Sequence, residues 1–389
     1  MKKVLFVIHR IGVGGSITSL LNLLEMLNDR GDRCDLFIME HEGVFLERAK
    51  RVSNVLAEDK ALASMLCDKS LLKQKYGLAG VWRRGVIHLK NKLFSSGDHR
   101  QEIYKRAAAK LDGYDAVVAY QENTTTEFTR YINAGKKIAW VHTMYDRFSV
   151  GYTKEEMLGV YENYGTVVCV AEASADSFGS ALPELEDRVK VIPNPLNEKL
   201  IIEKSMLEGA CVLPEDKKIL VSVGRLSPEK QYEYIMDAAA SMRDRRIDFV
   251  WYLIGGGTEK DKLEAIRAEK QLEDRVIMTG MLDNPYPIIK GADILVISSL
   301  YEAQPMVANE ALILDVPVIT TKYPSAATVI TNGENGAICE NSSAALTDAI
   351  ISVITDTEEY ARLKAGAEAF EYNSARVVDK IAEECGISR

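Results

Sequence analysis

The sequence predicts an α/β protein of two domains, each built on a parallel β-sheet. Short apolar runs rich in Val and Ile alternate with amphipathic helical patterns along the whole chain. This alternation is typical of parallel strands that are joined by helical crossovers. With 389 residues, the chain is long enough for two domains of ordinary size, each of which buries its own core.

The first domain is predicted to span residues 1–195. Its first helix is expected at 16–28, with Ser16 as the capping residue. A turn-forming sequence, Pro193-Asn194-Pro195, follows the last strand pattern and is interpreted as the linker between the domains. The strands of this domain are expected at 3–8, 34–39, 116–120, 137–141, 167–170 and 189–192.

The second domain is predicted to span residues 196–373 and to repeat the plan of the first. Both domains are therefore expected to be Rossmann-like. Because ligands of open α/β sheets bind beyond the carboxyl ends of the strands, the functional residues are expected to face one interdomain cleft. The strands of the second domain are expected at 219–223, 249–254, 276–279, 294–297 and 316–320.

The composition excludes several classes of protein. The formal net charge of −9 argues against a nucleic-acid-binding protein, which is usually basic. No run approaches the roughly 20 apolar residues of a membrane span, and no signal peptide precedes the first strand pattern. A cytoplasmic location is therefore expected, and the six cysteines stand singly, as in reduced cytosolic proteins. They are Cys34, Cys67, Cys169, Cys211, Cys339 and Cys385.

The segment 69–110 is basic although the whole chain is acidic. It contains eleven Lys and Arg residues against two acids, with apolar residues interleaved among them. Basic amphipathic segments bind anionic membrane surfaces, at about 1 kcal/mol per cation held close to the lipid. One interpretation is peripheral contact with the inner face of the cell membrane. The alternative is a solvated helix pair that packs on its own domain.

The first motif is the octapeptide GRLSPEKQ at 224–231. It follows an apolar strand pattern at 218–223 and precedes a helical pattern. It supplies two cations, Arg225 and Lys230, which suit the charge of a diphosphate. An ordinary ion pair at an exposed helix start is the alternative interpretation.

The second motif, EAQPMVANE at 302–310, follows the strand pattern at 292–298 and opens a helix. Pro305 lies near its first turn, where free backbone N–H groups face an anion. Glu302 lies before this helix and Glu310 about five residues inside it, so the two carboxylates sit at different depths along one elongated ligand. Carboxylates accept strong hydrogen bonds from polyols, so one suits a sugar and the other a ribose. The ligand that the two motifs suggest is a nucleotide-sugar.

These segments resemble the GRL-x3-K and E-x7-E motifs of retaining glycosyltransferases with the GT-B fold, in glycosyltransferase family 4, which includes bacterial cell-surface glycan enzymes. The resemblance covers nearly the whole chain. The other matching segments, in order, are KVLFVI at 3–8, GVGGS at 12–16, WVHT at 140–143, VVCVAEA at 167–173 and VIPNP at 191–195. The resemblance implies a GT-B architecture in which the last helix, within 374–389, packs back on the first domain.

The resemblance also implies roles for single residues. Arg225 and Lys230 would stabilise the leaving diphosphate without a metal ion. The chain contains no D-x-D metal signature, so neither a metal nor a cofactor is expected. Glu302 would face the donor sugar and Glu310 the ribose, although the helix dipole alone also favours a carboxylate at 310. His142, after the strand at 137–141, would contact the donor sugar; a satisfied structural histidine is the alternative.

Further residues complete the predicted donor site. Gly14 and Gly15 let the backbone approach a ligand closely, although a strand-to-helix turn is an equal reason for glycine there. Gly256 resembles part of the family's second glycine turn, near the nucleotide, and the backbone near Leu282 is expected to read the base. Gln304 departs from the family pattern and is expected to read a different hydroxyl arrangement. The remaining expected donor contacts are Gly224, Pro305, Met306 and Val307.

The sequence therefore predicts a hexosyltransferase of cell-surface polysaccharide or glycoconjugate synthesis. It would move a hexose or N-acetylhexosamine from a nucleotide-sugar, UDP favoured over GDP, to a hydroxyl of a glycan or lipid-linked acceptor. One alternative is a catalytically silent nucleotide-sugar-binding subunit of another transferase, which the intact motif set disfavours. Another is a non-hydrolysing UDP-sugar epimerase, which shares the fold but needs a different acid–base constellation.

Overall fold

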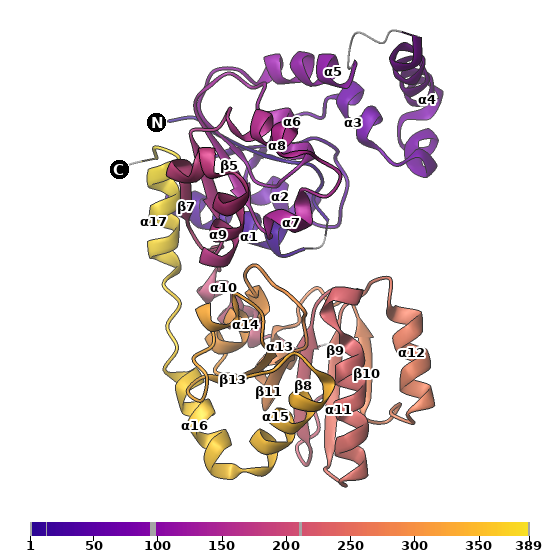
Figure 1. Cartoon of the computed structure of the whole chain (residues 1–389), viewed down its shortest axis with the longest axis vertical. Coiled ribbons are helices and arrows are strands. Elements are labelled where there is room, and N and C mark those ends of the chain that lie inside the picture. The colour runs from indigo at the N-terminus through magenta and orange to yellow at the C-terminus, as the bar shows by residue number, and fades with distance from the viewer. Residues whose placement is uncertain (1, 13, 94–98, 210–211, 388–389) are drawn as a thin grey trace. The chain divides into compact units, whose positions relative to one another are not determined.

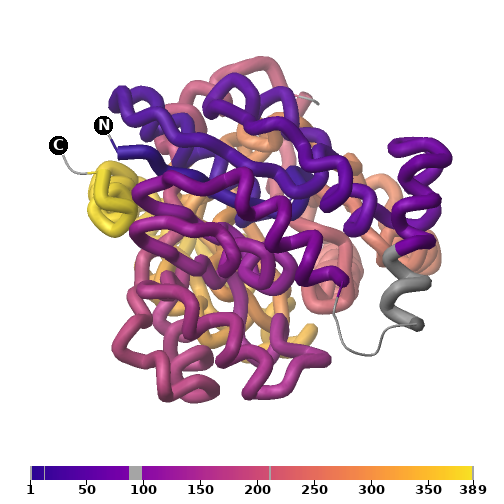
Figure 2. The backbone as a smooth tube through the Cα atoms, turned by 90° about the horizontal axis from the view of Figure 1, so that it is seen from above, coloured from indigo at the N-terminus to yellow at the C-terminus, as the bar shows by residue number. Residues whose placement is uncertain are grey.

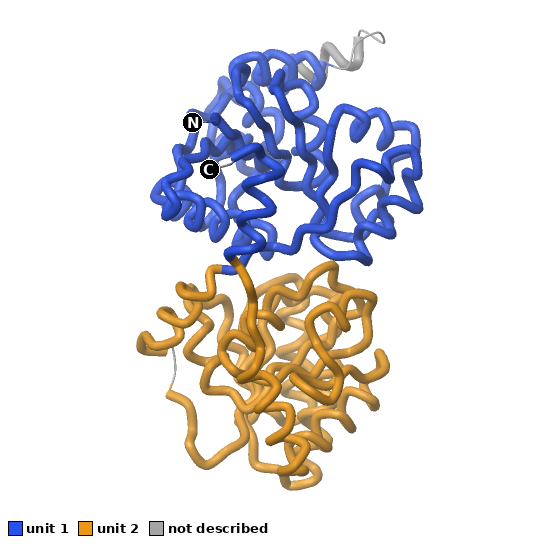
Figure 3. The backbone as a smooth tube through the Cα atoms, turned by 90° about the vertical axis from the view of Figure 1, so that its left-hand side faces the viewer, with its two compact units in different colours: residues 1–196, 375–389 blue, residues 197–374 orange. Residues whose placement is uncertain are grey.

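The computed structural model divides into two compact units (Figure 3). Unit 1 comprises Met1–Leu196 and Ala375–Arg389, and unit 2 comprises Asn197–Ser374. The structure describes residues 2–12, 14–93, 99–209 and 212–387, so the predictions for Cys211 and for part of the basic segment, 94–98, lie outside the described residues. Each unit contains one parallel sheet with helical crossovers, which confirms two Rossmann-like α/β domains.

The sheet of unit 1 has the strand order β3-β2-β1-β4-β5-β6-β7. In β1, Phe6 pairs with Leu36 on one side and with Val118 on the other. All residues of β1 are buried, as expected for a parallel strand that is covered on both faces. The strands are β1 (Val4–Ile8), β2 (Asp35–Ile38), β3 (Asn54–Val55), β4 (Tyr114–Ala119), β5 (Ala134–Val141), β6 (Thr166–Cys169) and β7 (Val189–Val191).

The helices of unit 1 begin with α1, which buries Ile17, Leu20, Leu24 and Leu27 along one face. The prediction that Ser16 caps this helix is wrong, because α1 already begins at Gly15. The α-helices of unit 1 are α1 (Gly15–Asp29), α2 (Leu46–Val52), α3 (Lys60–Leu66), α4 (Lys69–Leu93), α5 (His99–Ala108), α6 (Thr124–Thr129), α7 (Tyr145–Phe148), α8 (Lys154–Tyr161), α9 (Glu172–Ala181) and α17 (Ser374–Glu384).

Helix α4 contains a break within the basic segment. Gly77 has φ 62° and ψ −162°, which no helical residue adopts, so two helical stretches meet there. In Figure 1 this helix lies at the edge of unit 1, away from the sheet. Among the helices in the described ranges, none combines the length and apolarity that crossing a bilayer requires.

Helix α17 belongs to unit 1 although it follows all of unit 2 in the chain. Glu384 accepts hydrogen bonds from Lys190 Nζ at 2.5 Å and Thr166 Oγ1 at 2.6 Å, and Asp379 accepts one from Arg30 at 2.8 Å. The buried faces of Ile381 and Cys385 complete the contact. Figure 2 shows α17, in yellow, beside the N-terminal part of the chain.

The sheet of unit 2 has the order β10-β9-β8-β11-β12-β13. β12 begins later than expected because Pro317, which lacks an N–H group, precedes it. β13 was not predicted, because it is a short edge strand that starts with glycine and is only partly buried. The strands are β8 (Lys218–Val223), β9 (Phe249–Ile254), β10 (Val276–Gly280), β11 (Ile294–Ile297), β12 (Val318–Thr321) and β13 (Gly336–Cys339).

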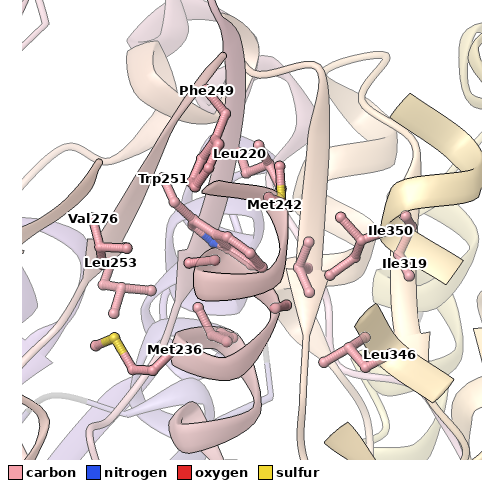
Figure 4. Packing of buried hydrophobic residues seen from close by; sticks show 14 of the residues in the cluster. Leu220, Met236, Met242, Phe249, Trp251, Leu253, Val276, Ile319, Leu346 and Ile350 are labelled. Carbon is pink, nitrogen blue, oxygen red and sulfur yellow. The ribbon is translucent and has the colours of Figure 1, made fainter. Parts of the chain in front are cut away.

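The core of unit 2 is centred on Trp251 of β9. Its indole packs among side chains that include Met236 and Leu346 (Figure 4). The buried indole N–H donates to Ser222 Oγ at 3.2 Å, and Ser222 donates onward to the Val296 carbonyl at 2.7 Å, so no polar atom of this pair is left unsatisfied. The helices are α10 (Glu198–Ser205), α11 (Tyr232–Asp244), α12 (Lys260–Glu269), α13 (Tyr286–Lys290), α14 (Met306–Ile313), α15 (Ser343–Thr355) and α16 (Thr357–Glu368).

Candidate active site

The first motif forms the loop between β8 and α11. Leu226 is buried and anchors this loop, whereas the neighbouring Arg225 is exposed. Within the described residues Arg225 has no ion-pair partner. Gln231 takes a left-handed conformation (φ 49°), which ends a short 3₁₀ turn and lets α11 begin at Tyr232. The loop therefore presents a guanidinium at the carboxyl end of β8.

The glycine run at 255–257 packs directly against this loop through the backbone. A Cβ atom at Gly255 would lie 1.8 Å from the Gly224 carbonyl oxygen, and one at Gly257 would lie 2.2 Å from the Leu226 carbonyl oxygen. The carbonyl of Gly256 accepts a hydrogen bond from the Leu226 N–H at 3.0 Å. Glycine is therefore required at 255 and 257 by the close approach of two chain segments. At Gly256 a Cβ would meet only the Met281 side chain, at 3.3 Å.

Lys230 and Glu302, 72 residues apart in sequence, form an ion pair at the carboxyl ends of β8 and β11. Ser299 Oγ donates to the same Glu302 oxygen at 2.8 Å. Ser298 Oγ donates to the Lys230 carbonyl at 2.6 Å, and Ser325 Oγ donates to the Glu302 carbonyl at 2.6 Å. The three hydroxyls fix the backbone and the carboxylate of the pair. Sequence reasoning missed these serines, although two of them directly follow the strand pattern.

Helix α14 presents its N-terminus at the second motif. Pro305 precedes the helix, and Met306 and Val307 open it. In the described part of the chain no side chain caps this end, so its first N–H groups remain available to an anion. Gln304 hydrogen-bonds the Tyr372 side chain, a contact that the sequence did not indicate. Leu282 is half-buried and follows Gly280, which has a positive φ of 71°.

Glu310 lies in the fifth position of α14 and is 8% exposed. The Tyr286 hydroxyl donates to its carboxylate at 3.3 Å. Burial disfavours the charged form and raises the pKa of Glu310 to about 7, against smaller lowering effects of Tyr286 and Lys204. At neutral pH, Glu310 can therefore either accept or donate a hydrogen bond.

We expect Glu310 to make stability depend on pH. Its raised pKa means that the folded protein keeps a proton that the unfolded chain releases above pH 4.5, so the free energy of unfolding falls as pH rises from 4.5 to about 7. The total loss is about 3 kcal/mol. Urea unfolding of the wild type and of Glu310→Gln across this range measures it. The Gln variant should lack this component, and parallel profiles for the two proteins would contradict the assignment.

In unit 1, His142 directly follows β5 and is half-buried. Its Nε2 hydrogen-bonds the Tyr120 carbonyl at 3.0 Å, and its ring lies 5.0 Å from that of Tyr120. Because a carbonyl only accepts, Nε2 carries the proton and Nδ1 is the acceptor nitrogen. Burial lowers the pKa of His142 to about 4, so the imidazole is neutral at physiological pH. In this tautomer the acceptor nitrogen is Nδ1, which is buried, and the Asn194 side chain also hydrogen-bonds the ring.

The turn between β4 and α6 holds the backbone of His142. Glu122 Oε1 accepts hydrogen bonds from the N–H groups of His142 and, at 3.1 Å, of Thr143. The next residue, Asn123, has φ 56° and ψ −114°, outside the regions that residues with a side chain normally occupy. Such a conformation costs about 1–3 kcal/mol. Sequence reasoning missed both residues, since no local pattern marks a strained turn that lacks glycine.

Gly14 precedes α1 in an extended conformation (φ 166°) that any residue can adopt. A Cβ atom there would meet nothing within 4 Å, and Gly15, the first residue of the helix, is exposed. Within the described residues, neither turn geometry nor packing therefore requires glycine at position 14. Close approach of a ligand remains the predicted reason for it.

Residues 208–370, most of unit 2, match the family model described as glycosyl transferases group 1. An uncharacterized glycosyltransferase of Methanocaldococcus jannaschii is 28% identical over 194 residues, which cover 46% of this chain and 48% of the relative. An Escherichia coli UDP-Gal:alpha-D-GlcNAc-diphosphoundecaprenol alpha-1,3-galactosyltransferase is 23% identical over 320 residues, or 80% of this chain and 74% of the relative. The chain spans about half the length of several curated relatives that it matches.

Among solved structures, Anabaena Alr3699/HepE in complex with UDP-glucose superimposes with a TM-score of 0.74 at 17% identity, covering 100% of both chains. At this identity the likeness shows the fold, two parallel-sheet Rossmann-like domains. The GT-B fold that the sequence predicted is thereby confirmed, and residues 208–370, which match the glycosyl transferases group 1 model, lie in its second domain.

Proposed function

We propose that the protein is a retaining glycosyltransferase of family 4 that moves a hexose or N-acetylhexosamine from a nucleotide-sugar, UDP favoured over GDP, to a hydroxyl of a glycan or lipid-linked acceptor. The observation that carries the proposal is the arrangement in unit 2. The exposed Arg225 and the Lys230–Glu302 pair lie at the carboxyl ends of β8 and β11, and the uncapped helix α14 begins a few residues after Glu302. The family model covers this segment, and the UDP-glucose complex of HepE has the same fold.

The proposed chemistry follows from the charges. When the bond between the sugar and the β-phosphate breaks, negative charge develops on the departing nucleoside diphosphate. Arg225, Lys230 and the free N–H groups of α14 stabilise that charge without a metal ion. The acceptor hydroxyl attacks the same face of the sugar carbon, and its proton passes to the departing phosphate oxygen. The configuration at the sugar carbon is thereby retained.

The carboxylates and the histidine are assigned to hydroxyl groups. Glu302, already held by Ser299 and Lys230, has lone pairs for hydroxyls of the donor sugar. Glu310 suits the ribose, because a carboxyl group with a pKa of about 7 can accept from one hydroxyl and donate to another. The neutral His142 accepts from a sugar hydroxyl. The identities of the donor sugar, the base and the acceptor are part of this proposal.

A thermal-shift screen of UDP, GDP, ADP and their sugar conjugates, with and without magnesium, tests the donor class. A ligand at 100 times its Kd stabilises the fold by about 2.7 kcal/mol. We expect UDP or its sugars to raise Tm equally in magnesium and in EDTA. Stabilisation only with magnesium would reject the metal-free mechanism. Binding without transfer to any acceptor glycan or lipid would favour a silent subunit instead.

We also propose that unit 1 contacts an anionic membrane through α4. Leu78, Val81 and Trp82 share one helical face and are 75%, 42% and 71% exposed. The exposed cation Arg83 follows Trp82 directly in the chain, and the exposed Lys73 lies on the helical stretch before the break at Gly77. Other cations of the basic segment are engaged inside the unit: Lys75 with Glu40 and Glu42, Arg100 with Glu127, and Lys110 with Asp59. An apolar face with basic flanks suits the inner face of a cell membrane, where a lipid-linked acceptor would lie.

Liposome sedimentation at low salt measures this contact. We expect retention on vesicles that contain anionic lipid and little retention on neutral ones, because each cation near the lipid contributes about 1 kcal/mol. The double variant Leu78→Ser/Trp82→Ser should lose retention. Val150→Ser, which changes an apolar residue of unit 1 that is 75% exposed outside the basic segment, is the control. Equal retention on both vesicle types, or retention of the double variant, would count against membrane contact.

A further inference from the structure

We propose that Glu122 is the positioning residue of His142: its carboxylate, set by the strained turn at Asn123, fixes the backbone that carries the imidazole. This inference rests on the proposed role of His142. It assigns a task to a half-buried acid that none of the sequence motifs includes and that would not touch the substrate.

The geometry begins with two neighbouring strands. β4 and β5 pair in parallel, with Val118 opposite Ile138 and Ala119 opposite Ala139. Glu122 and His142 both lie just past the ends of these strands, where the regular ladder no longer supplies partners. One oxygen of Glu122 accepts both the His142 and the Thr143 N–H groups. The carboxylate therefore takes the place of a neighbouring strand's carbonyl as the acceptor for these N–H groups. It thereby fixes the direction of the backbone after β5.

The ring of His142 is held from the same turn. Tyr120, two residues before Glu122, accepts the Nε2 hydrogen bond through its carbonyl and stacks on Trp140 with ring centroids 5.0 Å apart. Its hydroxyl hydrogen-bonds Ser19 Oγ at 2.8 Å, and Ser19 donates to Asn194 at 2.9 Å. Residues 120–122 thus fix the imidazole at the ring and at the backbone. A freely rotating ring would not present one nitrogen in one direction.

Asn123 gives the reason for the conformation of this turn. It is a non-glycine residue with φ 56° and ψ −114°, and its side chain does not cap α6. Its buried Oδ1 has no hydrogen-bond partner within the described residues. The strain is therefore not offset by a local capping bond. Backbone strain of this kind persists where the surrounding structure imposes it. Here the strained turn allows the Glu122 carboxylate to bind the backbone N–H groups that follow β5.

The test compares Glu122→Ala, Glu122→Asp and Glu122→Gln in the full-length protein. The amide oxygen of Gln can accept both N–H groups, so Glu122→Gln should keep kcat within about threefold of wild type. Asp is shorter by one methylene, and Ala lacks an acceptor; both should lower kcat, Ala by about 10- to 100-fold, as expected for a misplaced catalytic group. The KM for the donor should change less than kcat. His142→Ala should have little further effect in the Glu122→Ala background.

A second measurement does not depend on turnover. In wild type the His142 ring should remain neutral down to about pH 4, as followed by its NMR C2–H resonance and assigned with His142→Ala. In Glu122→Asp the ring should titrate closer to its ordinary range. This readout keeps the proposal testable if Glu122→Ala does not fold. Asp112→Ala is the control. It removes a comparable hydrogen bond, which the Asn133 N–H donates to Asp112 Oδ1 at 3.1 Å, and it should leave kcat and the resonance unchanged.

The outcomes separate the two hypotheses. If His142→Ala keeps wild-type kcat, the proposed role of His142 fails, whatever Glu122 does. If His142→Ala lowers kcat but Glu122→Ala and Glu122→Asp retain both wild-type kcat and the wild-type titration, the positioning proposal alone is overturned. If Glu122→Gln loses as much kcat as Glu122→Ala, the acceptor geometry is not what matters, and the proposal is overturned as well.

Discussion

Replacing Lys230 with alanine is expected to lower kcat by about two to three orders of magnitude, comparable to the loss of one preorganised electrostatic group. Lys230 would stabilise the charge on the departing diphosphate, and Glu302 fixes its ammonium group. Glu302→Ala should cause a loss of similar size, because it would remove the proposed sugar contact and also frees the lysine. Steady-state kinetics with the donor found in the thermal-shift screen measures both.

The structure offers a matched control for this prediction. Lys218 and Asp293 form a 3.1 Å ion pair between the same two strands, β8 and β11, at their amino ends. Lys218→Ala removes an equivalent charge at the opposite ends of these strands from the candidate site, so it should leave kcat unchanged. The Lys230→Ala/Glu302→Ala double variant should lose less than the product of the two single losses, since the residues act as a unit. Near-wild-type turnover of Lys230→Ala would reject its assignment.

Gly257→Ala is expected to displace the loop that carries Arg225. The added Cβ would lie 2.2 Å from the Leu226 carbonyl oxygen, and the backbone on both sides would have to shift. Overpacking of this kind lowers the free energy of unfolding by about 1–3 kcal/mol. Because the same shift would displace Arg225 from its proposed contact with the diphosphate, UDP should bind at least about tenfold more weakly, which corresponds to about 1.4 kcal/mol. Calorimetric titration with UDP and urea unfolding measure the two effects.

Gly366→Ala separates loop displacement from general destabilisation. A Cβ at Gly366, on α16, would lie 2.0 Å from the Glu334 carbonyl oxygen, a comparable clash in the same unit. It should lower stability by a similar amount and leave the UDP affinity of the folded protein unchanged. If Gly257→Ala weakens UDP binding no more than Gly366→Ala does, the close packing of the glycine run does not serve the nucleotide site.

The repeating strands and their crossovers could be read from the sequence, because buried parallel strands leave continuous apolar runs. Most expected strands match the observed ones within two residues. The strand expected at 137–141 is longer in the structure and begins at Ala134. β3 and β13 were not expected, because they are short edge strands with little burial, and Ser16 failed as a cap because α1 starts before it. The break of α4 at Gly77 was not foreseen, since a single glycine is tolerated in many helices.

Residues of the candidate site could be predicted from the sequence only where a charged residue comes soon after a predicted strand. Lys230 and Glu302 stood out in this way, but their direct pairing depends on β8 and β11 being neighbours, which the order of strands along the chain does not reveal. The hydrogen bond between Glu122 and the backbone of His142 was missed for the same reason. The Gln304–Tyr372 bond joins two loops far apart in sequence. Such contacts follow from topology, whereas the motifs follow from local chemistry.

The return of α17 to unit 1 has a consequence for biosynthesis. On the ribosome, Asn197–Ser374 emerges before the helix that completes the first unit, so unit 2 has its whole sequence available while unit 1 still lacks one element. Until α17 arrives, the partners of Glu384 and of the buried Ile381 stay uncovered. Unit 2 can thus complete its fold first, and unit 1, which carries His142, completes its fold only after α17 has emerged. A chain that ends directly after residue 374 would contain the whole of unit 2 and an incomplete unit 1.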